Sequence, residues 1–472
     1  ARALDLNGDR DAALAGFNRV IELNPEAAQP LAQRCNLRAR MGETDAAIQD
    51  CDRALLANPK LTTALDFRGQ IFVTEGRYDD ALKDFTAVID IKGDSDAYLA
   101  RCDAYKQMGD AETARADCRK AVEISPNDAN AHEAMADVLV DLGLYSSATD
   151  EYGAAIELSP ARASLFVARA DAFIRTGRPD RAADDARNAI SIDPDNAMAH
   201  NNLGVALERQ GSIDEAFEEY QKAIQLDPSD ALPLMNRADI YRQRGQLNLA
   251  LVDLNRAVSL NSKNPDLLLS RAWVFRLKGQ FDVALADADR ALSIDKRQAW
   301  GHFERGAALE GLGRNGDAVT AYEQAILIDP DYVPAIRNRG GLLGRLGNFT
   351  AALVDLDLAI AKDPEDGAAL LFRCRVRNSI GRNTEALADC DNALTIDPGR
   401  AETHYGRALV LFDLGRAQDA LKSIDRGILL WPDDPEPRIA RFLWSVILID
   451  WNTAGLDFIH LLAVRTGSVR RD

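Results

Sequence analysis

Residues 211–228 read GSIDEAFEEYQKAIQLDP, and this stretch decides the fold. Apolar side chains recur every three or four residues from Ile213 to Ile224, which is the spacing of one face of an α-helix. Gly211 precedes the run, and a residue without a Cβ easily adopts the left-handed conformation that turns a chain. Pro228 follows the run, where its ring and missing N–H stop a helix. The stretch therefore predicts a helix over residues 213–226, between a glycine turn and a proline stop.

The same markers recur along nearly the whole chain. The glycine returns every 34 residues, with one step of 33, at Gly8, Gly42, Gly76, Gly109, Gly143, Gly177, Gly211, Gly245, Gly279, Gly313, Gly347, Gly381 and Gly415. An alanine stands five residues after each glycine, from Ala13 to Ala420. A proline usually follows the glycine by 17 residues, as at Pro25 and Pro432. A second amphipathic run precedes each glycine, so each period predicts two antiparallel helices that approach closely at the alanine.

A period of 34 residues with these markers resembles the tetratricopeptide repeat. The resemblance implies an all-α, right-handed superhelical solenoid of about 13 helix-turn-helix repeats, whose concave groove is lined by the first helix of each pair. We expect a partial repeat over residues 1–27, twelve repeats over residues 28–434, and a degenerate repeat or capping helices over residues 435–472. Because Ala1 falls inside a repeat, the sequence reads as a fragment or a processed product.

The C-terminal segment, residues 435–472, departs from the repeat. It keeps helical periodicity but has Ile449 where the glycine belongs, and it contains Trp444, Trp451 and Phe458. Two interpretations stay open. The segment is either a terminal helix that covers the last hairpin, as solenoids need, or a surface for partner docking or self-association.

Charge and hydropathy exclude several classes of partner. The 472 residues contain 56 Lys and Arg against 74 Asp and Glu, so the net charge is −18. Such a surface repels phosphate backbones and anionic lipid headgroups, so we expect neither nucleic acid nor bare membrane as a partner. The longest apolar runs, such as residues 442–449, are too short to cross a bilayer, so no direct membrane insertion is expected.

The six cysteines form three pairs, each with a spacing of 16 residues: Cys35 and Cys51, Cys102 and Cys118, Cys374 and Cys390. In the register of the family that the chain resembles, each pair takes the eighth and twenty-fourth positions of one repeat, which face each other across the hairpin. We infer three disulfides, each joining the two helices of a hairpin. Such bonds persist in oxidising compartments, which favours a periplasmic or extracellular location and the bacterial exported type of repeat protein. The alternative is six buried thiols in a cytoplasmic protein.

Other polar residues have positions that indicate a structural role. Arginine fills the seventh position of ten repeats, and eight of these have aspartate at the twenty-third, which suggests an ion pair between the two helices of a hairpin. Four histidines, His132, His200, His302 and His404, take the fourth position, where the family prefers an aromatic side chain packed between hairpins. The sequence has no phosphate-binding glycine loop, nucleophile elbow or metal-spaced histidines. We therefore expect no enzyme, no cofactor and no metal site.

The resemblance implies that a groove is lined by the second, fifth, sixth, ninth and twelfth positions of each repeat. In the N-terminal half these positions hold carboxylates, which form either a solvated face or a site for a basic partner: Asp66, Asp96, Asp103, Glu133, Asp137 and Asp171.

Later repeats place apolar, aromatic and arginine side chains at these groove positions, and such side chains are typical binding anchors. Our candidate partner-binding residues are Leu232, Met235, Arg242, Leu269, Trp273, Arg276, Trp300, Phe303 and Arg337, with Asn202 and Asn236 as a short ladder for a peptide backbone. The pattern continues at Leu371, Arg375, Tyr405 and Phe412. The aromatic residues could instead pack against the next coil of the superhelix or a chain end.

These observations predict a non-catalytic scaffold or adaptor that holds a protein or peptide partner in its groove, in a periplasmic or secreted assembly. Two alternatives remain. One is the substrate-recognition arm of a larger enzyme, such as a glycosyltransferase, and the other is a module of a polysaccharide or protein export machine. A co-chaperone type of clamp for acidic tails is not supported, because no three successive repeats carry its set of lysines and asparagines.

Overall fold

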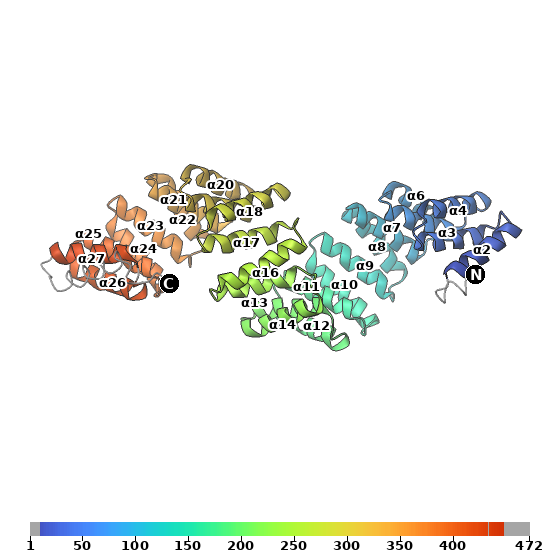
Figure 1. Cartoon of the computed structure of the whole chain (residues 1–472), viewed down its shortest axis with the longest axis horizontal. Coiled ribbons are helices and arrows are strands. Elements are labelled where there is room, and N and C mark those ends of the chain that lie inside the picture. Colours follow the sequence, from blue (N-terminus) through green and yellow to red (C-terminus); the bar gives the residue numbers. More distant parts are fainter. Residues whose placement is uncertain (1–9, 433, 448–472) are drawn as a thin grey trace. The chain divides into compact units, whose positions relative to one another are not determined.

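The computed structural model describes residues 10–432 and 434–447, and every regular element in them is an α-helix (Figure 1). This confirms the all-α class. The described helices are α2 (Arg10–Leu23), α3 (Ala28–Arg40), α4 (Thr44–Ala57), α5 (Thr62–Thr74), α6 (Tyr78–Ile91), α7 (Ser95–Met108), α8 (Ala111–Ile124), α9 (Ala129–Asp141), α10 (Tyr145–Leu158), α11 (Ala163–Arg175), α12 (Pro179–Ile192), α13 (Ala197–Arg209), α14 (Ile213–Leu226), α15 (Leu232–Gln243), α16 (Leu247–Leu260), α17 (Pro265–Leu277), α18 (Phe281–Ile294), α19 (Ala299–Gly311), α20 (Asn315–Ile328), α21 (Val333–Arg345), α22 (Phe349–Lys362), α23 (Gly367–Ser379), α24 (Asn383–Ile396), α25 (Ala401–Asp413), α26 (Ala417–Leu430) and α27 (Pro435–Ile447). Successive helices pack as hairpins within each unit, for example α3 with α4 and α25 with α26.

Two compact units make up the chain, an N-terminal unit (Ala1–Arg237) and a C-terminal unit (Ala238–Asp472), and the division falls within α15. Within each unit the second helix of one hairpin packs against the first helix of the next, as α12 does on α13 and α18 on α19. Successive first helices also touch, for example α3 with α5 and α21 with α23, whereas second helices in the described residues make no comparable contact with one another. Each unit is thus a solenoid, and its closely spaced first helices form one row, called here the first-helix face.

The glycine turn has the geometry that the sequence predicts. Gly211 follows α13 with a φ of 85°, a conformation that a side chain with a Cβ rarely adopts. Its N–H donates to the carbonyl of Glu208 over 3.0 Å, and the Ser212 N–H donates to the carbonyl of Leu207 over 2.9 Å. These two bonds satisfy carbonyls that the end of α13 would otherwise leave without a donor. The chain then reverses directly into α14.

The eighth and twenty-fourth positions of each repeat meet across the hairpin. In one kind of pair a glycine accommodates a large ring: a Cβ on Gly204 would lie only 2.5 Å from Cε1 of Tyr220, which is fully buried. In another kind both residues are cysteine, and the Cα atoms of Cys35 and Cys51 lie 5.5 Å apart, within the range that a disulfide spans. The sulfur atoms lie 2.05 Å apart in that pair, 2.06 Å in Cys102–Cys118 and 2.13 Å in Cys374–Cys390. A cysteine pair therefore occupies the place of a glycine and an aromatic ring in the hairpin core.

The arginine of the seventh position pairs with the aspartate of the twenty-third as a two-pronged ion pair. In α21 and α22, Nε and Nη2 of Arg339 donate to the two carboxylate oxygens of Asp355 over 2.8 and 2.7 Å. The same geometry recurs in Arg34–Asp50, Arg68–Asp84, Arg101–Asp117, Arg169–Asp185, Arg271–Asp287 and Arg373–Asp389. Each aspartate is buried, so the pair is shielded from water and holds the two helices of its hairpin together.

The same arginines also reach the preceding repeat, which the sequence analysis did not predict. Nη1 of Arg373 donates to Asp357 of the previous hairpin over 2.6 Å. Where the twenty-third position lacks aspartate, this second contact is the one that remains, as in Arg305 to Asp289 and Arg407 to Asp391. The row of arginines therefore links neighbouring repeats as well as the helices of one repeat.

The histidines of the fourth position form hydrogen bonds, so the expectation of plain core packing was incomplete. Nε2 of His132 lies 3.0 Å from the carbonyl oxygen of Pro126, and Nδ1 lies 2.6 Å from a carboxylate oxygen of Glu151. Burial lowers the pKa of His132, but its bonds to Glu151 and to the Pro126 carbonyl raise it more, so the net shift is upward. The same contact, between Nε2 of the ring and the carbonyl oxygen six positions earlier, recurs at His200, His302 and His404. Each ring therefore fixes the loop that precedes its own helix.

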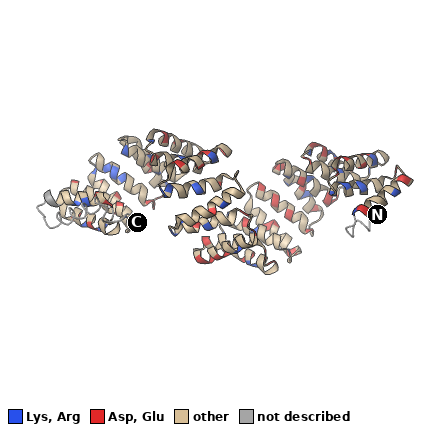
Figure 2. Cartoon of the chain, in the orientation of Figure 1, with Lys and Arg blue, Asp and Glu red and all other residues tan. Residues whose placement is uncertain are grey.

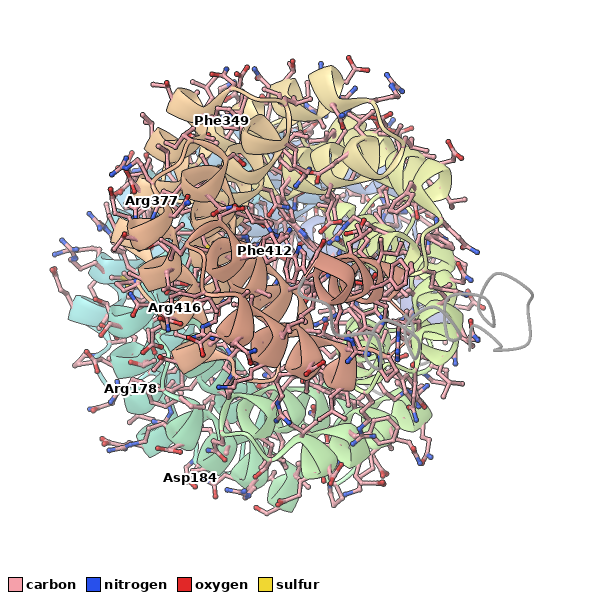
Figure 3. All side chains as sticks on the ribbon, turned by 90° about the vertical axis from the view of Figure 1, so that its left-hand side faces the viewer. Arg178, Asp184, Phe349, Arg377, Phe412 and Arg416 are labelled. Atoms are coloured by element: carbon pink, nitrogen blue, oxygen red, sulfur yellow. A yellow bond between two sulfur atoms is a disulfide. The ribbon has the colours of Figure 1, made fainter. Side chains whose placement is uncertain are left out.

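Helix α27 packs against α26 in the C-terminal unit. Trp444 of α27 is buried and stacks on Phe412 of α25, with ring centroids 4.5 Å apart and planes inclined by 8°; Figure 3 labels Phe412. The described part of the tail thus covers the last hairpin. Trp451, Phe458 and His460 lie outside the described residues.

Candidate partner-binding face

The candidate residues fall in two units that are considered separately. Asn202, Leu232, Met235 and Asn236 belong to the N-terminal unit, and Arg242, Leu269, Trp273, Arg276, Trp300, Phe303 and Arg337 belong to the C-terminal unit. In the N-terminal unit, Leu232 is exposed and Met235 is half-buried. Several residues of the C-terminal unit contact one another directly.

Two tryptophans on the first-helix face of the C-terminal unit contact each other. The rings of Trp273, on α17, and Trp300, on α19, meet edge to face with centroids 6.5 Å apart. The guanidinium carbon of Arg242 lies 3.7 Å from the Trp273 ring centroid, which is cation–π stacking, and Asp239 accepts from the same guanidinium over 2.6 Å. Both tryptophans are half-buried, so each keeps part of its surface in solvent. Part of their area is thus already occupied by packing within the chain.

A buried carboxylate organises the next layer of this face. Glu304 of α19 is almost fully buried and accepts two hydrogen bonds from Arg276 of α17, over 2.9 and 3.1 Å. Nε1 of Trp300 donates to Glu304 over 3.4 Å. Phe303 packs on Tyr322 and Tyr332 with centroid separations of 5.9 and 5.6 Å. Burial raises the pKa of Tyr332 to about 12, with Glu304 adding to the rise, so the phenol stays neutral. We call Arg242, Trp273, Arg276, Trp300 and Glu304 the aromatic–arginine cluster.

Three of the predicted groove residues are used inside the protein. Leu269 is fully buried, because the fifth position of its repeat points between neighbouring first helices, so its assignment as a contact residue was wrong. Phe303 is buried for the same reason and supports the face from below. Asn202 is also buried, and its amide nitrogen donates to the carbonyl of Val167 over 3.1 Å, so one of its two amide hydrogens is used within the chain.

The remaining polar candidates have partners within the chain. Asn236 donates to the side chain of Asn201 over 3.0 Å. Arg337 donates to Asp366 over 3.1 Å and to Asn338 over 3.1 Å. Two of these contacts, Asn236 with Asn201 and Arg337 with Asp366, join side chains about one repeat apart and were not predicted from the sequence.

The carboxylates of the N-terminal unit form a partly neutralised surface. Asp137 accepts from Lys106 over 3.0 Å and from the Tyr152 hydroxyl over 2.7 Å, and Glu133 pairs with Arg162. Several of these first helices show acidic positions in Figure 2. Asp66 differs, because burial raises its pKa to about 6, with Asp94 and Asp96 adding to the rise and Lys92 opposing it.

This shift predicts a pH dependence of stability. The folded state holds the Asp66 proton up to a pH of about 6, whereas an unfolded aspartate releases it near pH 4. The free energy of unfolding should therefore fall as pH rises from about 4 to about 6, by about 1 kcal/mol because the side chain is half-exposed. The Asp66→Asn variant should match the wild type at pH 4 and be more stable at pH 7.5, as judged by urea unfolding. Asp79→Asn, which removes an exposed carboxylate from α6, is the control, and an equal gain from it would contradict the assignment.

No helix among the described residues is both long and apolar enough to cross a membrane, and no group of three or more His, Cys, Asp or Glu side chains there is placed to hold a metal ion.

Comparison with known proteins identifies the repeat. The tetratricopeptide repeat family model matches residues 33–97, 133–197, 167–231, 337–401 and 381–435, which together exceed half of the chain. The chain belongs to the tetratricopeptide repeat family. Further models of tetratricopeptide repeats match residues 72–138, 238–275 and 301–332. No curated protein matches the chain.

Several solved tetratricopeptide repeat structures are similar to this one. The crystal structure of the APC/C hetero-tetramer Cut9–Hcn1 aligns over 95% of this chain and 96% of its own, with a TM-score of 0.59 and 14% identity, which shows the fold alone. Yeast Tom70 aligns over 87% of this chain and 97% of its own, with a TM-score of 0.40 and 17% identity. YrrB, described as a TPR protein with an unusual peptide-binding site, aligns over 39% of this chain and 95% of its own, with a TM-score of 0.33 and 24% identity.

Proposed function

We propose that this protein is a non-catalytic scaffold that holds a protein or peptide partner on the first-helix face of its C-terminal unit. The observation that carries the proposal is the aromatic–arginine cluster. Trp273 and Trp300 keep part of their surface in solvent, and neighbouring side chains already fix both rings. Anchors that are ordered before binding lose little side-chain entropy when a partner arrives.

The charges of the cluster support binding rather than catalysis. Arg276 and Glu304 neutralise each other, and Asp239 neutralises Arg242. A general base or nucleophile needs an ionisable group with a matched pKa that faces its substrate. These paired groups instead keep the side chains of the aromatic–arginine cluster in fixed positions. The cluster then presents a rigid surface with apolar and charged parts, which suits recognition of a partner's aromatic or aliphatic side chains.

We place this scaffold in an oxidising compartment, either the periplasm or the extracellular space. The support is the three cysteine pairs, whose sulfur atoms lie at bonding distance and which account for all six cysteines. In a reducing cytoplasm thiols are kept reduced, and nothing would favour their occurrence in facing pairs.

Capture of a partner from an extract of the source cells tests the proposal. The whole chain should retain a specific partner, and the double variant Trp273→Ala, Trp300→Ala should bind that partner at least about ten-fold more weakly, since anchors of this kind contribute 2 kcal/mol or more. The matched control is Leu327→Ala, Val354→Ala, which removes exposed apolar side chains from α20 and α22 of the same unit. Circular dichroism would verify that both variants fold. Equal binding by the wild type and the tryptophan variant would rule out this face.

A further inference from the structure

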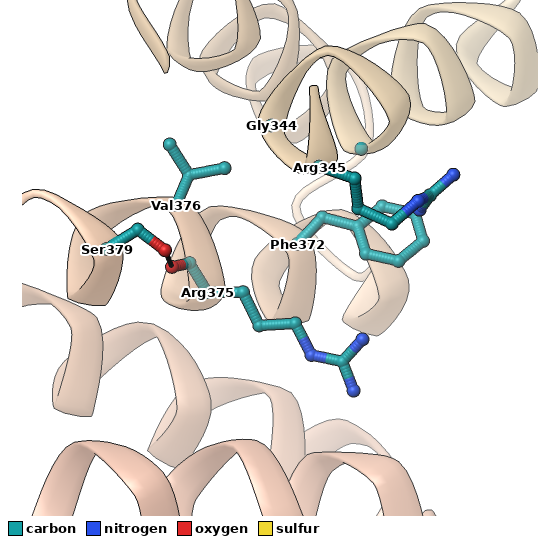
Figure 4. Close-up of a pocket in the computed structure, with 7 residues that line it drawn as sticks. Gly344, Arg345, Phe372, Arg375, Val376 and Ser379 are labelled. Carbon is teal, nitrogen blue, oxygen red and sulfur yellow. Dashed lines mark hydrogen bonds between the residues drawn. The ribbon is translucent and has the colours of Figure 1, made fainter. Parts of the chain in front are cut away.

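A small cavity opens on the first-helix face between α21 and α23 (Figure 4). Its volume is about 120 Å³, and it is lined by Gly341, Gly344, Arg345, Phe372, Arg375, Val376 and Ser379. A cavity of similar size in another protein accommodates benzene, so this one can take a single branched or aromatic side chain. All of its lining residues belong to the C-terminal unit.

Two glycines create this space. Gly341 and Gly344 take the ninth and twelfth positions of their repeat, where the repeat starting at residue 265 has Trp273 and Arg276. A Cβ on Gly341 would lie 2.7 Å from Cδ2 of Phe372, and one on Gly344 would lie 2.6 Å from Cγ2 of Val376. Helix α23 therefore approaches the bare backbone of α21, and the Phe372 ring and Val376 give the cavity an apolar lining.

The arginines around the cavity differ in their partners. Arg345 pairs with Glu310, and Arg373 and Arg377 both pair with Asp389. Within the described residues, the side chain of Arg375 has neither an ion pair nor a hydrogen bond. Among the described residues, Arg375 thus offers the first-helix face a guanidinium whose donors are not already used.

The surroundings of Arg375 suit an incoming anion. Its guanidinium points away from α21, beyond the Phe372 ring (Figure 4), and its Nε would lie 3.9 Å from a Cβ on Gly406 of α25. Helix α23 carries several basic positions in a chain of net charge −18 (Figure 2). Burial lowers the pKa of Arg375 and Glu402 opposes this, so the charge stands in partly dehydrated surroundings although the side chain reaches solvent. Pairing with a carboxylate would relieve that cost.

We propose that this cavity is a subsite for a partner peptide in which an apolar side chain stands next to a carboxylate. The apolar side chain fills the space between Phe372, Val376 and the two glycines, and the carboxylate accepts parallel hydrogen bonds from Arg375. The planar donors of this guanidinium match the two oxygens of a carboxylate. This inference rests on the proposed function, since it assigns the chemistry of a partner to the same first-helix face.

Titration of the whole protein with a small probe tests the subsite without any partner. The probe is 4-methylpentanoate, which joins a branched aliphatic group to a carboxylate, and the readout is the ¹³C-methyl resonance of Val376, assigned from its loss in Val376→Ala. A probe of about 8 heavy atoms should bind with a Kd in the millimolar range and shift the resonance saturably. The neutral 4-methylpentanamide lacks the charge and acetate lacks the apolar group, so each should bind at least about five-fold more weakly.

Variants complete the test. Arg375→Gln should weaken 4-methylpentanoate at least about five-fold, whereas Arg382→Gln, which removes an exposed arginine paired with Glu385, should leave it unchanged. Equal binding of the amide, equal binding of acetate, equal binding by Arg375→Gln, or no saturable shift would each overturn the subsite. These results do not depend on partner capture. If the tryptophan variant loses capture of the partner but the wild type does not bind the probe, only the subsite is ruled out. If the wild type binds the probe but the tryptophan variant captures the partner as well as the wild type does, only the tryptophan face is ruled out.

Discussion

Loss of the three disulfides should destabilise the protein by about 3 kcal/mol per bond, because each bond closes a loop of about 16 residues and restricts the unfolded chain. All six cysteines are almost fully buried, so a reductant should act only after unfolding. In urea unfolding, the refolded oxidised protein should therefore have a higher midpoint than protein unfolded and refolded with reductant.

The effect should be local, because stability in a solenoid is set by each repeat and its neighbours. Amide exchange in the reduced protein should rise most in the hairpins α3–α4, α7–α8 and α23–α24, which carry the cysteine pairs. The control is a variant with all six cysteines replaced by alanine, whose unfolding should not respond to reductant. Six titratable thiols in freshly isolated, denatured protein would contradict both the bonds and the oxidising compartment.

Removal of Asp355 should cost about 3 kcal/mol. Its side chain is 7% exposed and that of Arg339 is 22% exposed, so Asp355→Ala leaves a largely buried guanidinium without its two acceptors. The double variant Arg339→Met, Asp355→Leu should lose much less, since it leaves no buried charge without a partner and apolar side chains can occupy the space. Urea unfolding of both variants measures the difference.

An exposed ion pair in the same unit supplies the contrast. Arg314 and Asp317 form a close pair, but their side chains are 53% and 55% exposed. Asp317→Ala should therefore change the free energy of unfolding by less than about 0.5 kcal/mol. Similar losses in Asp317→Ala and Asp355→Ala would show that the row of buried arginine–aspartate pairs does not hold the hairpins together.

The sequence was sufficient to predict the helices, because their determinants are local and repeat thirteen times. The run from Ile213 to Leu226 forms α14 with the predicted bounds, and Gly211 forms the predicted turn. The partners at the eighth and twenty-fourth positions were predictable as well, because two antiparallel helices of constant length bring the same positions together in every repeat. Both features depend on spacing alone.

The candidate site was less predictable, because its contacts join long side chains on neighbouring repeats. The stacking of Arg242 on Trp273 and the burial of Glu304 under Arg276 depend on rotamers and on the separation of adjacent first helices. The burial of Leu269 and Asn202 depends on the same separation. One feature of the sequence could have predicted the contacts between neighbouring repeats. An aspartate, such as Asp357 or Asp391, stands 16 positions before the arginine that donates to it.

Site-specific photo-crosslinking tests the central claim, that the first-helix face of the C-terminal unit holds the partner. Leu277 on α17 and Ser379 on α23 are exposed on first helices, and Leu327 on α20 and Val354 on α22 are exposed on second helices. Each would be replaced in turn by p-benzoylphenylalanine and irradiated in an extract of the source cells. We predict one common adduct from positions 277 and 379 and none from positions 327 and 354. Adducts only from the second-helix positions, or equal adducts from all four, would contradict the account.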